Sequence, residues 1–170
     1  MATTTSNAVT LTAKRPRRDW VKIISIVLAV IEVGIAGYLT YADVLHAPVV
    51  CTKGGFWNCD AVQTSSYAYI GPIPVAVLGL AGALGILLVL ILESFVPFFA
   101  ARGRLLVFGM GLFGLVMSGY LTAVEAFVLH AWCIWCVGSA ITMVLLFILS
   151  FVRLWQAISA VPDEAEEAAE

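Results

Sequence analysis

The sequence predicts an all-α integral membrane protein, a bundle of four transmembrane helices capped on the outer side by one long loop. Of its 170 residues, 62% are apolar and only 12% are charged, and the mean hydropathy is +1.02. Soluble globular proteins carry about 25% charged residues. Four segments are long and apolar enough to cross a hydrocarbon core of about 30 Å, which takes roughly 20 helical residues.

The expected transmembrane helices span residues 20–41, 73–92, 105–124 and 132–152. Because unpaired backbone groups are intolerable in lipid, each segment must be helical, and short connections make sequential helices antiparallel neighbours. Together they form one membrane domain over residues 20–153, with the outer loop at residues 42–72. Residues 1–19 and 154–170 show no packing pattern, so we expect a disordered N-terminus and an acidic tail, both cytoplasmic.

The distribution of Lys and Arg predicts how the chain is oriented, since cytoplasmic flanks carry the positive excess. Of the nine basic residues, all except Lys53 fall on one side of the expected bundle. They are Lys14, Arg15, Arg17, Arg18, Lys22, Arg102, Arg104 and Arg153. We therefore expect both termini in the cytoplasm. The ending "EEAAE" has no Lys-Asp-Glu-Leu-type retrieval signal and suits the cytoplasmic membrane of a bacterium.

The four cysteines all fall on the outer side of this topology. Cys51 and Cys59 lie in the loop after the first helix, and Cys133 and Cys136 begin the fourth helix. The outer side is where disulfides form and persist. A Cys-x-x-Cys at a helix start is typical of redox pairs, because the exposed N–H groups and the helix dipole favour a thiolate there. All four cysteines are therefore candidate catalytic residues.

Two other interpretations of the cysteines remain open at this point. In one, structural disulfides only hold the outer loop of a non-catalytic four-helix membrane module. In the other, the four cysteines bind zinc. Seven residues separate Cys51 from Cys59, whereas structural zinc usually takes closely spaced pairs, and an oxidising exterior disfavours four free thiolates. We therefore expect no metal site.

One cysteine pair on a loop and one at the membrane suggest a relay of thiol–disulfide exchange. A thiolate attacks a disulfide through a mixed disulfide, so electrons can pass from a soluble dithiol to the loop pair and then to the membrane pair. A DsbA-like thioredoxin-fold partner lies at about −120 mV, so the final acceptor must be more oxidising still. The sequence offers no soluble domain in which a Gly-x-Gly-x-x-Gly fingerprint could hold a nicotinamide. A membrane quinone, menaquinone or ubiquinone, is the expected acceptor, and no nucleic acid is expected as a partner.

At these residues the chain resembles the prokaryotic form of the vitamin K epoxide reductase family. The resemblance rests on the loop "CTKGGFWNCDAVQTSSYAYIGPIPVA", the motif "WCIWCVGSA" and the order of four helices, over roughly residues 20–153. It implies a membrane thiol–disulfide oxidoreductase that supports disulfide bond formation. Some members carry a fused thioredoxin-fold domain, which this chain lacks, so the resemblance implies a separate thioredoxin-fold partner.

The resemblance also implies a role for each cysteine. Cys136 would contact the quinone, Cys133 would exchange with Cys59, and Cys51 would receive electrons from the partner. Ser65 stands at the position where the family places a Ser or Thr, six residues after the second loop cysteine. Its hydroxyl is expected either to hydrogen-bond the quinone or to steady the loop above it.

The polar contacts to the quinone depart from the animal branch of that family. Ala140 occupies the position of a quinone-linked Tyr, and "GPIPVAVLG" contains no Asn where the animal branch has one. Tyr67 and Ser139 are the candidate replacements. Among the remaining polar residues, Glu32 is expected at membrane depth. It is either a hydrogen-bonded residue of the bundle or a proton donor to the quinone. Glu125 and His130, with His46, are expected to be solvated near the outer surface.

Overall fold

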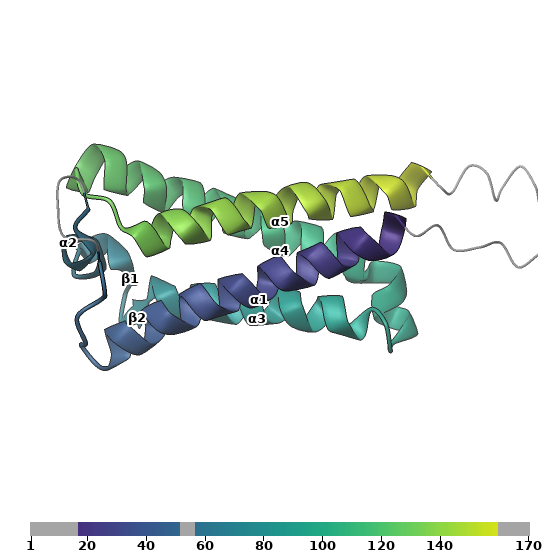
Figure 1. Cartoon of the computed structure of the whole chain (residues 1–170), viewed down its shortest axis with the longest axis horizontal. Helices are drawn as coiled ribbons and strands as arrows, with labels where there is room; N and C mark the ends of the chain where they lie inside the picture. The colour runs from purple at the N-terminus through teal and green to yellow at the C-terminus, as the bar shows by residue number, and fades with distance from the viewer. Residues whose placement is uncertain (1–16, 52–56, 160–170) are drawn as a thin grey trace, which may run out of the picture.

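The computed structural model describes residues 17–51 and 57–159. Four long helices run antiparallel along one axis (Figure 1): α1 (Arg17–Val44), α3 (Val75–Leu92), α4 (Pro97–Val124) and α5 (Ile134–Ser159). Helix α1 begins and helix α5 ends at the same end of the bundle, where the connection between α3 and α4 also lies. We call this the termini end, and we call the opposite end the loop end.

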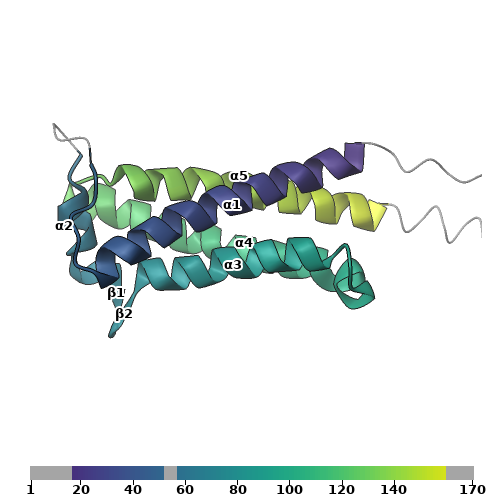
Figure 2. The ribbon, with the colours of Figure 1, turned by 60° about the horizontal axis from the view of Figure 1, so that its bottom comes forward.

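The helices pack as a ring in which α1 and α4 each lie between α3 and α5 (Figure 2). One apolar cluster fills the middle of the bundle and its termini end, and its buried members are Ala29, Ile86, Val89, Leu90, Val107, Met143 and Leu146. A second cluster, the loop-end cluster, contains the buried residues Leu39, Ala42, Val49, Cys59, Val62, Ala131 and Cys133. The second cluster joins the bundle to the loop that covers it.

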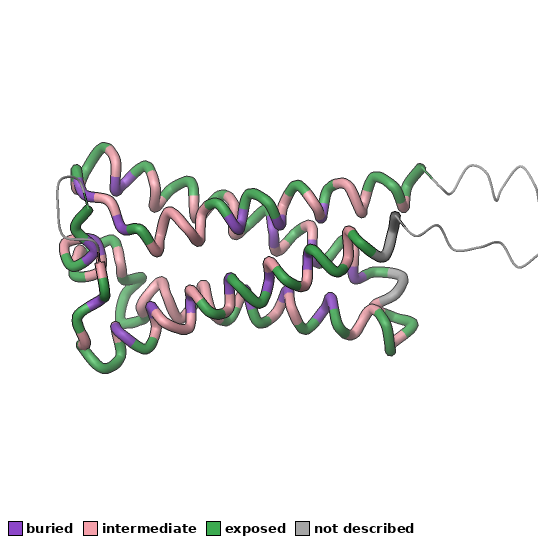
Figure 3. Tube along the Cα trace, in the orientation of Figure 1, coloured by how far each residue is buried: buried purple, intermediate pink, exposed green. Residues whose placement is uncertain are grey.

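The outward faces of the helices are apolar, as a membrane protein requires. Four helical stretches are long and apolar enough to span a bilayer: Trp20–Val44, Val75–Leu92, Arg102–Leu129 and Ile134–Ser159. Along each helix, buried positions alternate with exposed ones (Figure 3), and exposed positions include large apolar side chains such as Phe113, 70% exposed. Apolar surface on this scale is characteristic of lipid contact. The expected fold class, a transmembrane four-helix bundle with a loop cap, is confirmed.

The cap at the loop end is built from short elements. They are the helix α2 (Cys59–Gln63), the 3-10 helix η1 (Ser66–Ala68) and the strands β1 (Tyr69–Ile70) and β2 (Ile73–Pro74). The two strands pair antiparallel, Tyr69 with Pro74 and Ile70 with Ile73. Gly71 has a φ of 64°, which glycine adopts without a steric penalty. The hairpin leads the chain directly into α3.

The helix boundaries differ from the expected ones for local reasons. Helix α3 begins at Val75 rather than at residue 73, because Ile73 and Pro74 form β2. Helix α4 begins eight residues early, at Pro97, since proline at the first helical position gives up an N–H that would have no partner there. Beyond α4 the chain continues as a π-helix, η2 (Glu125–Leu129). The apolar stretch therefore extends past residue 124, where the sequence analysis ended it.

The chain ends also differ in part from the expectation. Helix α1 includes residues 17–19, which were expected to be disordered, and α5 continues to Ser159, into the expected acidic tail. In both places the helical hydrogen-bond ladder continues beyond the apolar segment. The expectations for residues 1–16 and 160–170, and the position of Lys53, lie outside the described residues.

Candidate redox site

All four cysteines come together at the loop end of the bundle. Cys51 and Cys59 form a disulfide with their Cα atoms 6.0 Å apart, while Cys133 and Cys136 are free thiols. Cys59 and Cys133 are buried members of the loop-end cluster, 1% and 0% exposed, and Cys51 and Cys136 are partly buried members of the same cluster. The two pairs are thus neighbours, although the chain separates them by two helices.

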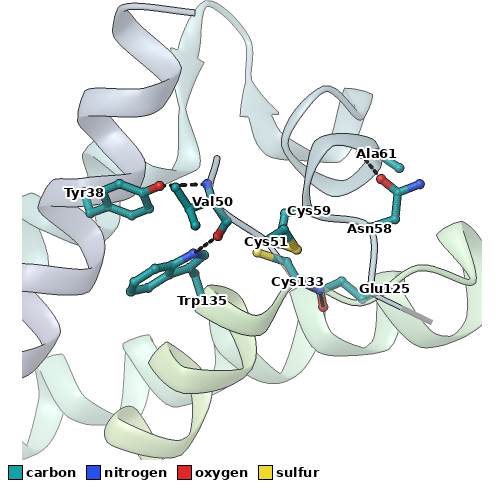
Figure 4. The surroundings of a disulfide bond; sticks show 9 residues. All are labelled: Tyr38, Val50, Cys51, Asn58, Cys59, Ala61, Glu125, Cys133 and Trp135. Atoms are coloured by element: carbon teal, nitrogen blue, oxygen red, sulfur yellow. Dashed lines mark hydrogen bonds between the residues drawn. A yellow bond between two sulfur atoms is a disulfide. The ribbon is translucent and has the colours of Figure 1, made fainter. Parts of the chain in front are cut away.

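The backbone holds Cys59 beside Cys133 (Figure 4). Trp57 lies two residues before Cys59 and Trp132 one residue before Cys133, and the two tryptophans form an isolated parallel bridge. The N–H of Asn58 donates a hydrogen bond to the carbonyl of Trp132 over 3.0 Å. The side-chain oxygen of Asn58 also accepts a backbone N–H within α2 over 3.1 Å, which caps that helix. One residue therefore begins α2 at Cys59 and ties it to the segment before Cys133.

Cys51 is positioned through its neighbour Val50. The N–H of Val50 donates to the hydroxyl of Tyr38 on α1 over 2.9 Å. The carbonyl of Val50 accepts the indole N–H of Trp135 on α5, also over 2.9 Å. The two aromatic rings contact each other with centroids 4.7 Å apart. Figure 4 shows how these contacts from two helices hold the backbone next to the disulfide.

The start of α5 favours a thiolate at Cys133. The carbonyl of Cys133 accepts the N–H of Val137 over 3.0 Å, so Cys133 stands at the N-terminus of the helix. Hydrogen bonds from the Cys136 thiol, and from the N–H groups of Cys136 and Trp135, lower the pKa of Cys133 although burial opposes this. In the reduced pair, Cys133 is accordingly the sulfur that ionises first.

A cavity of about 280 Å³ lies inside the bundle below the cap, and its wall is mostly apolar. Cys136 lines this cavity, together with Ser65, Tyr67 and Ser139. Cys133 does not belong to the cavity wall and instead lies in the loop-end cluster. The two cysteines of the Cys-x-x-Cys motif therefore have different surroundings, one facing the loop disulfide and the other the cavity.

The polar groups of the cavity wall differ in how they are engaged. The hydroxyl of Ser65 donates to the carbonyl of Val62 over 2.7 Å, which steadies the loop. The hydroxyl of Ser139 donates to Glu32 over 2.5 Å, and Tyr67 is 42% exposed. Gln63 also lines the cavity. Within the part of the chain that the structure describes, its buried amide nitrogen has no hydrogen-bond partner.

The amide nitrogen of Gln63 is a buried donor that an acceptor oxygen in the cavity can satisfy. A buried donor left without a partner costs about 1–3 kcal/mol, and a bound molecule, an ion or an ordered water can supply that partner. An apolar cavity with one unpartnered donor and an adjacent thiol fits a quinone ring, which is flat, apolar and carries carbonyl oxygens. Gln63 could not be predicted from the sequence, because a single amide in a polar loop carries no periodic or motif signal.

Two buried carboxyl groups line the same cavity. Glu32 is 2% exposed and contacts the hydroxyls of Ser139 and Thr142, which ties α1 to α5. Glu125 is 3% exposed, so the expectation that it is solvated near the surface is wrong. It lies in η2, which continues the apolar helix toward the redox pair. The residue could have been found as an acid inside the apolar run "LTAVEAFVL". His46 and His130 are exposed.

The sequence profile of the Vitamin K epoxide reductase family matches residues 7–151. The chain belongs to this family. Membership makes it a multi-pass membrane thiol–disulfide oxidoreductase, in a family whose members use quinones as electron partners. The bundle brings its two cysteine pairs together at one end, which is the arrangement that thiol–disulfide exchange between them needs.

Proposed function

We propose that this chain oxidises a thioredoxin-fold dithiol partner on the outer face of a bacterial cytoplasmic membrane and passes the electrons to a membrane quinone. One observation carries the proposal: the loop disulfide and the Cys-x-x-Cys pair share one apolar cluster, and only Cys136 among the cysteines lines the cavity. This arrangement gives the electrons a single order of sulfur atoms to follow.

The orientation follows from charge. Lys22, Arg102 and Arg153 belong to the termini end of the bundle, near the α3–α4 connection, where Lys22 donates to Ser94 and Arg153 pairs with Glu93. Basic residues favour the cytoplasmic side. We therefore propose that both termini are cytoplasmic and that the loop end, with the cysteines, faces the outside, where disulfides are made.

The first half of the proposed reaction takes place at the loop disulfide. Cys51 is partly exposed, whereas Cys59 is 1% exposed, so a thiolate of the partner attacks Cys51. The S–S bond breaks, the partner forms a mixed disulfide with Cys51, and Cys59 leaves as a thiolate beside Cys133. The second thiol of the partner then releases Cys51. The partner leaves oxidised, having given two electrons to the loop pair.

The second half moves those electrons to the membrane pair. When Cys133 and Cys136 are joined as a disulfide, the Cys59 thiolate attacks Cys133. Cys136 leaves as a thiolate that faces the cavity and then takes up a proton from water. Cys51 then attacks Cys59, which restores the loop disulfide and frees Cys133. After this exchange the loop pair is oxidised and the membrane pair reduced, and the disulfide of Cys51 with Cys59 and the free thiols of Cys133 and Cys136 support this order.

We propose that the quinone ring binds in the cavity next to Cys136. Gln63 donates its unpartnered amide N–H to a quinone carbonyl oxygen, and Tyr67 and Ser139 contribute further polar contacts. Ser65 acts mainly on the loop, because its hydroxyl already donates to Val62. The apolar remainder of the wall accommodates the ring and excludes water. When bound, the quinone accepts two electrons and two protons.

Reconstitution in lipid vesicles tests the proposal. The purified chain is mixed with a reduced thioredoxin-fold partner, with or without menaquinone or ubiquinone, and oxidation of the partner and reduction of the quinone are followed together. Wild type should oxidise the partner only when quinone is present. Cys136→Ala should abolish quinone reduction while leaving the loop disulfide intact. Quinone reduction that persists in Cys136→Ala would falsify the assignment.

Trapping of the mixed disulfide tests the order of the cysteines. In Cys51→Ala, Cys59 has no loop partner and should accumulate a cross-link to Cys133, visible by peptide mapping after acid quenching. The matched control is Cys51→Ala combined with Cys133→Ala, which should lose the cross-link. If the loop pair were only a structural staple, neither variant would join Cys59 to the membrane pair.

A further inference from the structure

Glu125 occupies a specialised position between two helices. Helix α4 ends at Val124 and continues as the five-residue π-helix η2, which begins at Glu125. The N–H of Ala131 donates to the carbonyl of Glu125 over 3.2 Å, and His130 ends the turn in the left-handed conformation with φ 50°. Short π-helical turns often occur at functional sites. Here the turn directs one carboxyl group to the start of α5.

That carboxyl group contacts both members of the redox pair. Its Oε2 accepts the backbone N–H of Cys133 over 3.2 Å, and Figure 4 shows the two residues side by side. The carboxyl also lies within reach of the Cys136 thiol. Glu125 lines the cavity as Cys136 does. A single acid therefore meets the amide of one cysteine, the thiol of the other and the proposed quinone site.

We propose that Glu125 is a catalytic residue, the base that takes the proton of the Cys136 thiol and passes it to the bound quinone. The inference rests on the proposed function and adds a residue to it. The contact with the Cys133 amide fixes the carboxylate, because a negative charge is favoured at a helix N-terminus. The contact with the thiol supplies the path of the proton.

The proposed step balances in electrons and protons. The S–H bond of Cys136 breaks as its proton moves to Glu125. The thiolates of Cys133 and Cys136 then become joined by an S–S bond, and the two electrons that they lose pass to the quinone. Glu125 returns one proton to the product. The second proton comes from water, in place of the one that Cys133 released when its thiolate formed. The products are the Cys133–Cys136 disulfide and a hydroquinone.

The other ionisable groups near Glu125 are less suited than Glu125 to accept the proton of Cys136. The N–H of Cys133, directly before α5, and the side chain of Cys136 on α5 face the carboxyl. Helix α2, which packs on η2, contributes the bonded sulfur of Cys59 and an exposed Asp60. The sequence of α3 contains no ionisable residue. From α1, Glu32 lines the same cavity, but its carboxyl is engaged by the hydroxyls of α5.

A thiol-alkylation profile tests the contact without any quinone. In Cys133→Ala the loop disulfide is retained and Cys136 is the one free thiol. Its rate of reaction with iodoacetamide, measured between about pH 5 and about pH 10, should rise in two steps with a plateau between them, because the carboxyl and the thiol titrate as a coupled pair and each step produces part of the thiolate. Adding Glu125→Gln should remove the plateau, so that the rate rises in one step.

A single-turnover assay tests the proton transfer itself. The reduced chain in detergent is mixed with a quinone that lacks an isoprenoid tail, such as menadione, and formation of hydroquinone is followed. Glu125→Gln should slow this step by about 100-fold, within the range for loss of a general base. Glu125→Asp keeps the carboxyl and should recover part of the rate. Asp60→Asn is the control: it removes an exposed carboxyl at the same end of the bundle and should change neither measurement.

The outcomes separate this inference from the proposed function. If wild type does not reduce the quinone at all, the proposed function fails and the step fails with it. If wild type reduces the quinone and folded Glu125→Gln does so at the same rate, the inference is wrong and the proposed function stands. Elution as a monodisperse peak in detergent shows that the variant is folded. A one-step alkylation profile in the presence of Glu125 also overturns the inference.

Discussion

The two ends of the bundle each contain a buried glutamate, and the neighbours of the two differ. At the termini end, Glu93 pairs with Arg153, and the two side chains are 7% and 10% exposed. At the loop end, Glu125 meets a backbone N–H and a thiol. A cation neutralises the first carboxyl, whereas the second contacts a group that can give it a proton. Glutamate thus stabilises the fold at one end of the bundle and is available for proton transfer at the other.

Loss of Arg153 should have the largest effect on stability. Arg153→Ala leaves Glu93 buried without its cation, and breaking such a pair typically costs 3–5 kcal/mol. We expect about 3 kcal/mol, at the lower end of that range, because neither side chain of the pair is completely buried. Unfolding in mixed detergent micelles, followed by tryptophan fluorescence, measures the change in the free energy of unfolding.

The same variant sharpens the comparison between the two ends. The folded fraction of Arg153→Ala should reduce quinone at the wild-type rate, since the pair lies at the end opposite to the cysteines. Arg153→Lys keeps the charge and should lose less stability than the alanine variant. Wild-type stability in Arg153→Ala, or a slowed thiol reaction at unchanged stability, would remove the distinction between a structural end and a reactive end.

Composition and periodicity were enough to predict the fold class. Membrane spans are readable because lipid forces every apolar segment of sufficient length into a helix. The boundaries were less predictable, since local groups decide them: Pro97 begins α4, and β2 delays α3 to Val75. The π-helix that directs Glu125 inward was not predictable either, because it depends on how α4 meets the start of α5.

The four candidate cysteines could be selected from the sequence because their chemistry and spacing are distinctive. Their convergence depends on contacts that spacing does not reveal, such as the Asn58 bond to Trp132 and the two bonds to Val50. Gln63 was missed for a related reason, since an unpartnered donor is recognisable only once the surrounding cavity exists. Polar residues of a binding site are therefore the least accessible part of a sequence-based prediction.

Gln63→Leu should change stability and quinone affinity in opposite directions. Leucine replaces a buried donor that lacks a partner, and removing such a group should stabilise the free protein by about 1 kcal/mol. The same change removes the proposed hydrogen bond to the quinone, so its KM should rise about tenfold, equivalent to about 1.4 kcal/mol. Detergent unfolding and quinone titration measure the two effects.

Thr64→Val is the matched control for Gln63, because the Thr64 hydroxyl bonds within its own turn, to the carbonyl of Asp60, and Thr64 does not line the cavity. It should leave the KM for quinone unchanged. An unchanged KM in Gln63→Leu would show that this amide does not recognise the quinone. The distinction between a reactive loop end and a structural termini end would then rest on the thiols and Glu125.

Tyr69→Phe should have the smallest effect, confined to alkaline pH. The Tyr69 hydroxyl donates to Asp43 over 2.6 Å and links the hairpin to the end of α1. This hydrogen bond, with the nearby carboxylate charge, raises the pKa of Tyr69. Because the pKa of Tyr69 is raised in the folded state, its hydrogen bond contributes fully to stability below the unfolded pKa of about 10. The contribution disappears as the pH rises through the higher pKa of the folded state.

At neutral pH, Tyr69→Phe should therefore be slightly less stable than wild type, because it lacks this hydrogen bond. At strongly alkaline pH, wild type should lose the same small contribution to stability. The temperature of unfolding, compared between about pH 8 and about pH 11, measures the difference between the two proteins, which should shrink as the pH rises. A difference that stays constant with pH would mean that the hydroxyl acts by packing rather than by its proton. Because Tyr69 contacts neither the cysteines nor Glu125, quinone reduction by the variant at neutral pH should be unchanged, which separates the anchoring of the cap from the thiol chemistry beneath it.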